Sequence, residues 1–585
     1  MKDFFKYVLA TVVGLFGVWF ILSALSFLML IAMVAAGDTQ PNVKNNTVLK
    51  ISLAGTLNER ATENPLAELF GNKALDNQGL KDLLGAIKAA KENKKVKGIY
   101  IEAGVLSADF ATLEELRKAI ADFKKSGKFV VSYADNYTQG AYYVCSVADE
   151  VLLNPNGMLD WHGIASEPVF YKEVLDKLGV KMQVFKVGTY KSAVEPFILT
   201  QMSDANREQV ESFINDIWSN LCRSVSESRK ISTDSLNAYA DRYVAMEDAQ
   251  SYVGMKLVDK LTYADQVREG LRKRLDGKKV NFVSATALAK LYKPKKGDGQ
   301  VAVYYAEGSI VDEVSAGLSR ESEIVGQKVV NDLDELAEDE NVKAVVLRIN
   351  SGGGSAYASE QMWRAIQLLR KKKPVVVSMG GLAASGGYYM SCGADHIIAE
   401  PTTLTGSIGI FGLIPDMSGL LTQKIGLHFD VVKTNEASDF GATGRPFNAA
   451  EGAAMQAYVD RGYQLFLKRV AEGRKMTTEA VDSIAQGRVW TGQQALGLKL
   501  VDALGTLDDA VAKAASLAKL KEYSTTTFPG KHSIFNNLFE EEKEGYMERK
   551  VREVLGVYYE PIQLVRAAQS GNYLQARMLY APNLK

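Results

Sequence analysis

Short apolar runs alternate with amphipathic stretches along most of this chain. Residues 98–101 and 129–132 are apolar runs, and between them residues 113–124 place their apolar side chains at helical spacing. Strands that alternate with amphipathic helices are typical of an α/β unit with a parallel sheet. The pattern therefore predicts an α/β fold, with longer helical parts at roughly 204–275 and 449–520.

The first apolar stretch is much longer than the others. No charged residue lies between Lys6 and Asp38, and residues 7–37 are almost entirely apolar. A signal peptide has an apolar core of roughly 7–15 residues, whereas about 20 apolar residues span a bilayer. We therefore expect a retained single-pass anchor, with a cleaved signal peptide as the alternative. Because Lys2 and Lys6 precede the anchor, the rest of the chain is predicted to lie outside the cytoplasm.

The remaining pattern occurs twice. Residues 96–101 align with residues 342–347, and in the same register Gly140 aligns with Gly386. Near the end of each half, Gly-Met-Lys-Leu-Val-Asp is matched by Gly-Leu-Lys-Leu-Val-Asp. An internal repeat of this length indicates two copies of one structural unit. The predicted segments are the N-terminus with its anchor (1–37), the first copy (47–291), the second copy (300–522) and a C-terminal tail (523–585).

Composition restricts the function. Lys and Arg balance Asp and Glu at 69 each, so nothing in the overall charge indicates a nucleic-acid partner. Cys145, Cys222 and Cys392 show no CxxC or Cys/His metal spacing, so neither a disulfide framework nor a zinc site is indicated. We interpret them as buried apolar residues, and we expect no cofactor.

A candidate nucleophile follows a strand in the second copy. The apolar run at 375–377 leads into a glycine-rich stretch at 379–387, which we predict to be a tight turn with Ser385 at the N-terminus of the next helix. Free backbone N–H groups and the positive end of the helix dipole would lie close to that serine. The alternative is that these small residues only allow close helix–sheet packing.

A second glycine-rich stretch strengthens this hypothesis. Residues 345–349 form another apolar run, which ends in three consecutive glycines, 352–354, before a helix predicted at 360–369. Glycines can turn a backbone N–H outward, as an oxyanion hole requires. A phosphate-binding loop is excluded because no Gly-Lys-Ser/Thr follows the glycines.

The two copies have lost complementary residues. In the alignment Ser385 stands opposite Gln139, so the first copy lacks the nucleophile. The first copy instead has Lys191, for which the second copy has no counterpart. A serine hydroxyl needs a base, and a lysine can serve if burial among apolar neighbours keeps it neutral. The alternative is an ordinary solvated lysine. The four histidines, His162, His396, His428 and His532, stand in ordinary loop, strand or tail contexts.

At these residues the chain resembles the signal peptide peptidase A (protease IV) family in its long, duplicated form. The segments that carry the resemblance are Tyr-Lys-Ser-Ala-Val-Glu-Pro-Phe around Lys191, Ala-Ala-Ser-Gly-Gly-Tyr around Ser385, and Leu-Thr-Gly-Ser-Ile-Gly at 404–409. The resemblance implies a fold similar to the Clp protease and crotonase superfamily. It also implies Ser385 as nucleophile, Lys191 as general base, and the N–H groups of Gly354 and Gly386 as the oxyanion hole. Gly352 stands where this family usually has proline.

The resemblance further implies a membrane-anchored homotetramer that degrades the remnants of signal peptides on the periplasmic or other extracytoplasmic side of the inner membrane. The leading hypothesis is therefore a serine endopeptidase with a Ser/Lys dyad that acts on apolar, unfolded peptides. One alternative is a catalytically inert membrane scaffold. The other is a crotonase-like acyl-CoA enzyme, which is disfavoured because the predicted anchor places the chain away from cytosolic thioesters.

Overall fold

The computed structural model describes residues 6–7, 11, 14–25, 43–61, 77–291, 297–313, 323–530 and 574–578. Most of the anchor predicted at residues 7–37 lies outside these ranges. Within them, no helix combines the length and the apolar character that crossing a bilayer requires.

The first copy is built around a parallel sheet. Its described residues form seven strands in the order β2-β1-β3-β4-β5-β7, with β8 beside β1. Helices α3, α4, α5 and α8 bury their apolar residues against one face, and α11 covers the other. The strands are β1 Thr47–Asn58, β2 Asn77–Gly79, β3 Val96–Ser107, β4 Phe129–Tyr137, β5 Glu150–Leu159, β7 Lys260–Leu261 and β8 Asn281–Ser284. The helices are α3 Leu80–Glu92, α4 Phe110–Lys124, α5 Gln139–Cys145, α8 Asp204–Arg229, α9 Thr233–Ala240, α10 Ala249–Gly254, α11 Ala264–Arg274 and α12 Ala285–Ala289.

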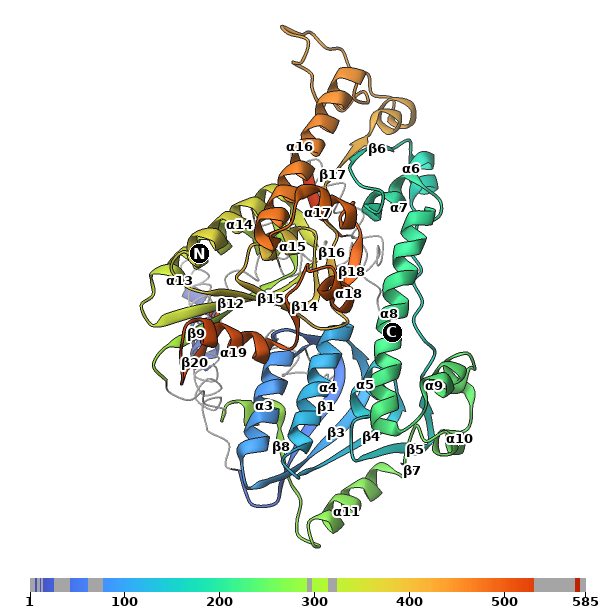
Figure 1. Ribbon diagram of the computed structural model, residues 1–585, viewed down its shortest axis with the longest axis vertical. Coiled ribbons are helices and arrows are strands. Elements are labelled where there is room, and N and C mark those ends of the chain that lie inside the picture. The colour runs from blue at the N-terminus through green and yellow to red at the C-terminus, as the bar shows by residue number, and fades with distance from the viewer. Residues whose placement is uncertain are drawn as a thin grey trace.

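The second copy repeats this architecture above the first (Figure 1). In the part that the structure describes, its sheet has eight strands, in the order β18-β16-β14-β12-β9-β20, with β15 beside β14 and β19 beside β15. The strands are β9 Gln300–Glu307, β12 Val342–Ser351, β14 Val375–Ala384, β15 His396–Ala399, β16 Leu404–Gly406, β18 Val489–Thr491, β19 Ala503–Leu504 and β20 Ser524–Phe528. The helices are α13 Gly326–Glu338, α14 Ala356–Arg370, α15 Gly386–Ser391, α16 Ala449–Arg474, α17 Thr478–Ile484, α18 Gly492–Gly497 and α19 Leu507–Leu517.

Equivalent interactions confirm that the two halves are copies of one unit. The long helices α8 and α16 both have 26 residues and both end in an arginine. Arg229 pairs with Asp259 at 2.9 Å in the first copy, and Arg474 pairs with Asp502 at 2.6 Å in the second. Both aspartates belong to the repeated segment that ends in Leu-Val-Asp. The equivalent arginine therefore links the long helix to the Leu-Val-Asp segment in each half.

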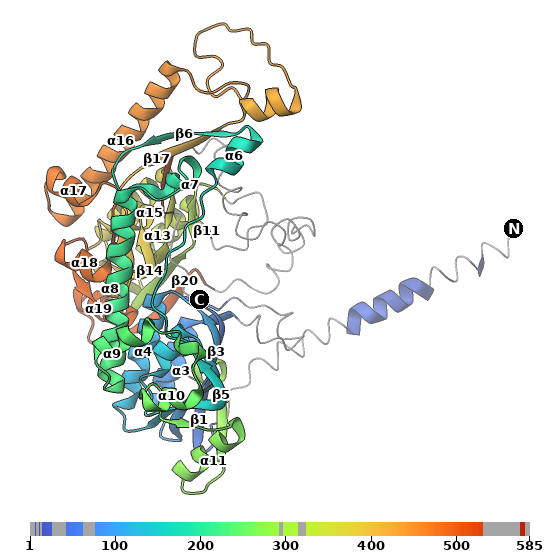
Figure 2. The same cartoon turned by 90° about the vertical axis from the view of Figure 1, so that its right-hand side faces the viewer.

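The two copies are joined by a third, smaller sheet. Among the residues that the structure describes it has six strands, in the order β11-β10-β13-β21-β17-β6. Strand β6 (Lys181–Lys186) belongs to the first copy and pairs antiparallel with β17 (Phe411–Asp416) of the second. Figure 2 shows these two strands side by side at one end of the molecule, and α8 extending along both copies. The other strands are β10 Ser309–Val311, β11 Glu323–Val325, β13 Gly353–Ser355 and β21 Leu574–Arg577.

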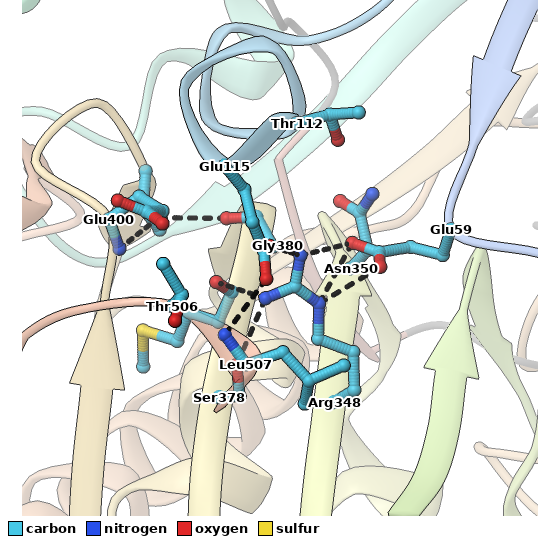
Figure 3. A network of polar contacts seen from close by, with 12 residues as sticks. Glu59, Thr112, Glu115, Arg348, Asn350, Ser378, Gly380, Glu400, Thr506 and Leu507 are labelled. Atoms are coloured by element: carbon cyan, nitrogen blue, oxygen red, sulfur yellow. Dashed lines mark hydrogen bonds and ion pairs between the residues drawn. The ribbon is translucent and has the colours of Figure 1, made fainter. Parts of the chain in front are cut away.

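A buried ionic network also connects the copies (Figure 3). Arg348 on β12 donates to Glu59, just after β1, at 2.9 Å and to Glu115 of α4 at 2.8 Å. All three side chains are at most 2% exposed. The other carboxylate oxygen of Glu115 accepts from the backbone N–H of Leu507, the first residue of α19. Burial raises the pKa of Glu59 to about 7, although the charge of Arg348 acts against that shift.

One sequence prediction is wrong in detail. The stretch 379–387 does not begin as a turn, because strand β14 continues to Ala384 and pairs with β16 there. Gly380 and Gly381 lie in this extended part. A Cβ on Gly380 would lie 2.6 Å from the carboxylate of Glu59, and one on Gly381 would overlap Asp109. These glycines therefore allow the first copy to approach the strand closely.

Two predicted helices begin earlier than expected. The helix predicted at 113–124 begins at Phe110, because Asp109 caps it by accepting from the backbone N–H of Thr112. The helix predicted at 360–369 begins at Ala356, where Ser355 is the cap. All three cysteines are free and buried, as predicted.

Candidate active site

Ser385 lies at the junction between β14 and α15, in the unusual backbone conformation that this junction imposes. Its φ is +55° and its ψ is −113°, a region in which an L-residue is strained by about 1–3 kcal/mol. The conformation is held by a hydrogen bond of 2.8 Å from the backbone N–H of Ser385 to the carbonyl of Gly406. The residue is fully buried. The sequence prediction that Ser385 precedes the helix is thus confirmed.

Lys191 reaches this serine from the other copy. It follows β6, and its Nζ lies 2.9 Å from Oγ of Ser385. The preceding residue, Tyr190, donates its backbone N–H to the carbonyl of Gln486 in the second copy at 2.8 Å. Gly487, at φ +79°, makes this approach possible, since a Cβ there would lie 2.6 Å from the backbone nitrogen of Lys191. The structure therefore brings together the two residues that the complementary losses singled out.

Helix α8 holds the segment that carries Lys191 in place. The side-chain amide of Gln209 donates to the carbonyl of Tyr190 at 3.0 Å and to the hydroxyl of Ser192 at 2.8 Å. Its carbonyl oxygen accepts from the backbone N–H of Val489 in the second copy at 3.2 Å. In addition, the guanidinium of Arg488 lies 4.6 Å from the centre of the Tyr190 ring. One glutamine and one stacked arginine thus fix the lysine segment to the second copy.

The surroundings of Lys191 favour its neutral form. The side chain is 1% exposed, and its Nζ lies 5.9 Å from the centre of the Phe411 ring. No carboxylate of the described residues forms an ion pair with it, and burial alone lowers its pKa to about 7. An ammonium in such a place loses hydration without gaining a counter-charge. Lys191 is therefore poised to exchange a proton near neutral pH.

Ser407 is a site residue that the sequence reasoning missed. Its carbonyl oxygen lies 3.2 Å from Nζ of Lys191 and its hydroxyl oxygen lies 3.1 Å away. A neutral amine has two N–H donors and one lone pair. If both donors point to Ser407, the lone pair points to the hydroxyl of Ser385. The only sequence clue was the segment Leu-Thr-Gly-Ser-Ile-Gly, in which Gly406 and Ser407 both adopt positive φ, at +77° and +48°.

The two predicted oxyanion-hole glycines lie on backbones that meet beside Ser385. Gly354 is in β13, and Gly386 is the first residue of α15. Gly353, which directly precedes Gly354, takes a φ of +92°, and a Cβ on it would lie 2.5 Å from the backbone nitrogen of Gly386. Gly352, the residue that replaces the expected proline, has no such positive φ. The sharp left-handed turn of this loop therefore depends on Gly353.

The equivalent place in the first copy is filled by structural hydrogen bonds. Gln139, which stands opposite Ser385, accepts from the backbone N–H groups of His162 and Gly163 at 3.0 Å each. Its amide donates to the carbonyl of Gly163 at 2.9 Å. Accordingly, the described part of the first copy offers no nucleophile at this position. As for the histidines, His162 pairs with Asp160, and His396 lies 3.9 Å from Asp502.

Comparisons with protein-family models find matches in both copies. The sequence model of peptidase family S49 matches residues 122–278 and 367–521, once in each copy. The Clp protease model matches residues 312–403, the stretch that contains Gly354, Ser385 and Gly386.

Three curated proteins are similar over most of the chain. Protease 4 of Salmonella typhi is 40% identical over 469 residues, which cover 78% of this chain and 75% of that protein. Protease 4 of Haemophilus influenzae is 35% identical over 556 residues, 90% of this chain and 89% of that one. The chloroplastic serine protease SPPA of Arabidopsis thaliana is 32% identical over 487 residues, 82% of this chain and 70% of that protein.

Proposed function

Because the chain belongs to peptidase family S49 and is a serine peptidase, we propose that Ser385 is its nucleophile and Lys191 its general base. The observation that carries the proposal is the distance of 2.9 Å between Nζ of Lys191 and Oγ of Ser385, in a site without a described carboxylate partner for the lysine. The pair comes from both copies, so one chain forms one site.

The proposed reaction begins with neutral Lys191. Its lone pair takes the proton of the Ser385 hydroxyl while Oγ attacks the carbonyl carbon of the peptide bond. The carbonyl oxygen becomes negatively charged, and the N–H groups of Gly354 and Gly386 stabilise it. Lys191, now an ammonium, gives its proton to the nitrogen of the leaving peptide, so that an acyl-enzyme and a free amine remain. Water then attacks the ester, again with Lys191 as base, and releases the second peptide.

Ser407 supports both halves of this cycle. Its two oxygen atoms accept from Nζ whether the lysine is neutral or charged. They therefore keep the lone pair directed at Ser385 in the neutral form and stabilise the ammonium that forms during the attack. We assign Ser407 the part of a positioning residue.

We further propose that the enzyme degrades cleaved signal peptides and other apolar, unfolded peptides. The long uncharged run at residues 7–37, with Lys2 and Lys6 before it, supports a membrane anchor with the two copies outside the cytoplasm. A homotetramer is the assembly that the family resemblance implies. Mass spectrometry of the mature N-terminus tests retention of the anchor, and sedimentation of the detergent-solubilised chain tests the subunit number.

Covalent labelling tests the assignment of the nucleophile directly. A fluorophosphonate probe reacts with an activated serine, so wild-type protein is expected to be labelled and Ser385→Ala is not. Ser391→Ala is the matched control, because Ser391 is equally buried and lies in the adjacent helix but donates only to the carbonyl of Gly387. Lys191→Ala should also label poorly. Labelling of Ser385→Ala at the wild-type level would refute the proposal.

A further inference from the structure

Arg488 of the second copy lies over two aromatic rings, one from each copy. The carbon of its guanidinium is 4.6 Å from the centre of the Tyr190 ring and 4.5 Å from the centre of the Trp490 ring. Its Nη1 also donates to the hydroxyl of Tyr190 at 3.0 Å and pairs with Glu208 of α8 at 2.9 Å. A planar guanidinium is well suited to stacking on aromatic faces. One side chain therefore connects the two rings across the contact between the copies.

The first of these rings belongs to the segment of the proposed base. Tyr190 directly precedes Lys191 in the chain. Gly487, the residue before Arg488, lies against the same lysine, since a Cβ on this glycine would be 2.7 Å from the Cβ of Lys191. The backbone before Arg488 thus forms a wall of the lysine's surroundings, and the side chain of Arg488 holds the adjoining tyrosine.

The second ring leads to the proposed nucleophile. Trp490 packs against Gly406, where a Cβ would lie 3.0 Å from the Cδ1 atom of the indole. The carbonyl of Gly406 accepts the hydrogen bond that holds Ser385 in its strained conformation. Trp490 is itself fixed, because its Nε1 donates to the carbonyl of Ile484 at 2.9 Å. The arginine therefore reaches the backbone that supports Ser385 through one ring and the segment of Lys191 through the other.

The main chain of Arg488 contacts the third residue of the site. Its carbonyl accepts from the backbone N–H of Ser407 at 2.7 Å, and the N–H of Gly487 donates to the carbonyl of Ile408 at 2.8 Å. Ser407 in turn supplies the two oxygen atoms that accept from Nζ of Lys191. The same residue thus holds the segment of the amine with its side chain and the acceptors of the amine with its backbone.

We propose that Arg488 is a positioning residue for the pair of Lys191 and Ser385, which clamps the lysine segment against the second copy and keeps water away from the amine. This role rests on the proposed function of the pair. The exposed fraction rises from 1% at Lys191 to 19% at the side chain of Arg488 and 56% at that of Glu208, so solvent reaches the outer side of the arginine. Because burial is what lowers the pKa of Lys191, hydration of the amine raises it again.

The pH dependence of the reaction tests this role. Arg488→Gln removes the flat guanidinium, so Lys191 should become hydrated and keep its proton to higher pH. We expect the acidic limb of kcat/KM, measured on a fluorogenic peptide between pH 5 and 10, to move up by about 0.5 pH unit or more. The variant should then be at least about threefold slower than the wild type at pH 6, with a smaller difference at pH 9. Arg488→Lys should shift the limb in the same direction, because an ammonium has no flat face to lie over the rings.

Arg469→Gln is the matched control. Arg469 lies 3.8 Å from the centre of the Trp363 ring, pairs with Glu360 and is also 19% exposed. Both partners belong to α14, so this arginine holds neither Tyr190 nor Ser407. Its variant should keep the acidic limb of the wild type even if its melting temperature falls.

An unshifted limb in Arg488→Gln, or in Arg488→Lys if thermal unfolding shows that the glutamine variant is not folded, would overturn the proposal. An equal shift in Arg469→Gln would overturn it as well. Neither result would change the fluorophosphonate labelling of the wild type or its loss in Ser385→Ala, so the positioning role and the proposed nucleophile fail separately.

Discussion

Lys191 and Ser385 are separated by 194 positions in the chain, yet the Nζ of one lies 2.9 Å from the Oγ of the other. Each residue comes from a different copy of the repeat, and neither copy holds both. The antiparallel pairing of β6 with β17 brings the lysine segment into the second copy, and Gln209 fixes it there. The duplication has therefore produced one composite site in place of two identical sites.

Ser385, the proposed nucleophile, can be tested for backbone strain as well as for reactivity. We expect Ser385→Ala and Ser385→Gly both to lose roughly 10⁴-fold or more in kcat/KM, because each lacks the hydroxyl. Since the φ of residue 385 is +55°, Ser385→Gly should be about 1 kcal/mol more stable than Ser385→Ala. Chemical denaturation measures the difference. A glycine variant that is less stable than the alanine variant would contradict the assigned backbone strain.

The activity should depend on pH through Lys191. Burial lowers the pKa of Lys191 to about 7, and only the neutral amine accepts a proton. We therefore expect kcat/KM to be low below pH 6 and to rise as the pH increases through about 7. Lys191→Arg keeps the positive charge but stays protonated, so it should be as inactive as Lys191→Ala. Activity of Lys191→Arg within tenfold of the wild type would exclude a lysine base.

Burial of the same lysine should lower the stability of the fold. The pKa of Lys191 is about 7 in the folded state and about 10.4 in the unfolded chain. Between these values the unfolded state binds more protons, so this group makes the protein more stable as pH rises and imposes its full penalty below pH 7. We expect Lys191→Met to raise the free energy of unfolding by on the order of 2–4 kcal/mol at pH 6 and by less at pH 10. Denaturant titrations at both pH values measure this; a gain that does not shrink with pH would contradict it.

Ser407→Ala separates a positioning role from a merely structural one. Removing one oxygen atom that accepts from Lys191 should lower kcat by up to about 10²-fold and leave KM nearly unchanged. An acceptor stabilises the ammonium more than the amine, so its loss should also move the acidic limb of the pH profile to lower pH. A structural role alone would change the melting temperature without moving that limb. The profile is measured between pH 5 and 9 on a fluorogenic peptide.

The network around Arg348 should determine how firmly the copies hold together. Arg348→Ala would leave the carboxylates of Glu59 and Glu115 buried without their partner, which typically lowers stability by about 3–5 kcal/mol. Arg370→Ala is the matched control, because its ion pair with Asp395 is partly exposed and should contribute less than about 1 kcal/mol. Thermal unfolding compares the two. Equal effects would mean that the buried network does not stabilise the contact between copies.

Part of the candidate site could be predicted from the sequence, because the repeat allowed one copy to be compared with the other. Ser385 and Lys191 stood out because each has no counterpart in the other copy. Ser407 did not, because its part depends on the direction of a backbone carbonyl, which a positive φ sets and which no residue pattern encodes. Arg348 also stood in an ordinary apolar strand, and its partner Glu59 lies 289 positions away.

The glycines of β14 show that prediction of the fold from sequence meets the same difficulty. Gly380 and Gly381 were predicted to form a turn because glycine is the usual turn residue. In the structure they are extended, and their missing side chains make room for Glu59 and Asp109 of the first copy. A sequence reports that a glycine is present, but whether it serves a turn or a close approach depends on the segment that lies against it. For the same reason, the pairing of β21 with β13 had no local sequence pattern that could predict it.

The two residues of the candidate site are synthesised at different times, because they lie far apart in the chain. A ribosome makes Lys191 first and must add 194 more residues to reach Ser385, which takes about 10–40 s at ordinary rates of synthesis. Throughout that interval the emerging chain holds the proposed base without the proposed nucleophile. The serine, when it appears, stays unreactive until the second copy has folded against the first. On the proposed assignment, a newborn chain of this peptidase therefore has no complete catalytic pair until both copies have been synthesised and folded.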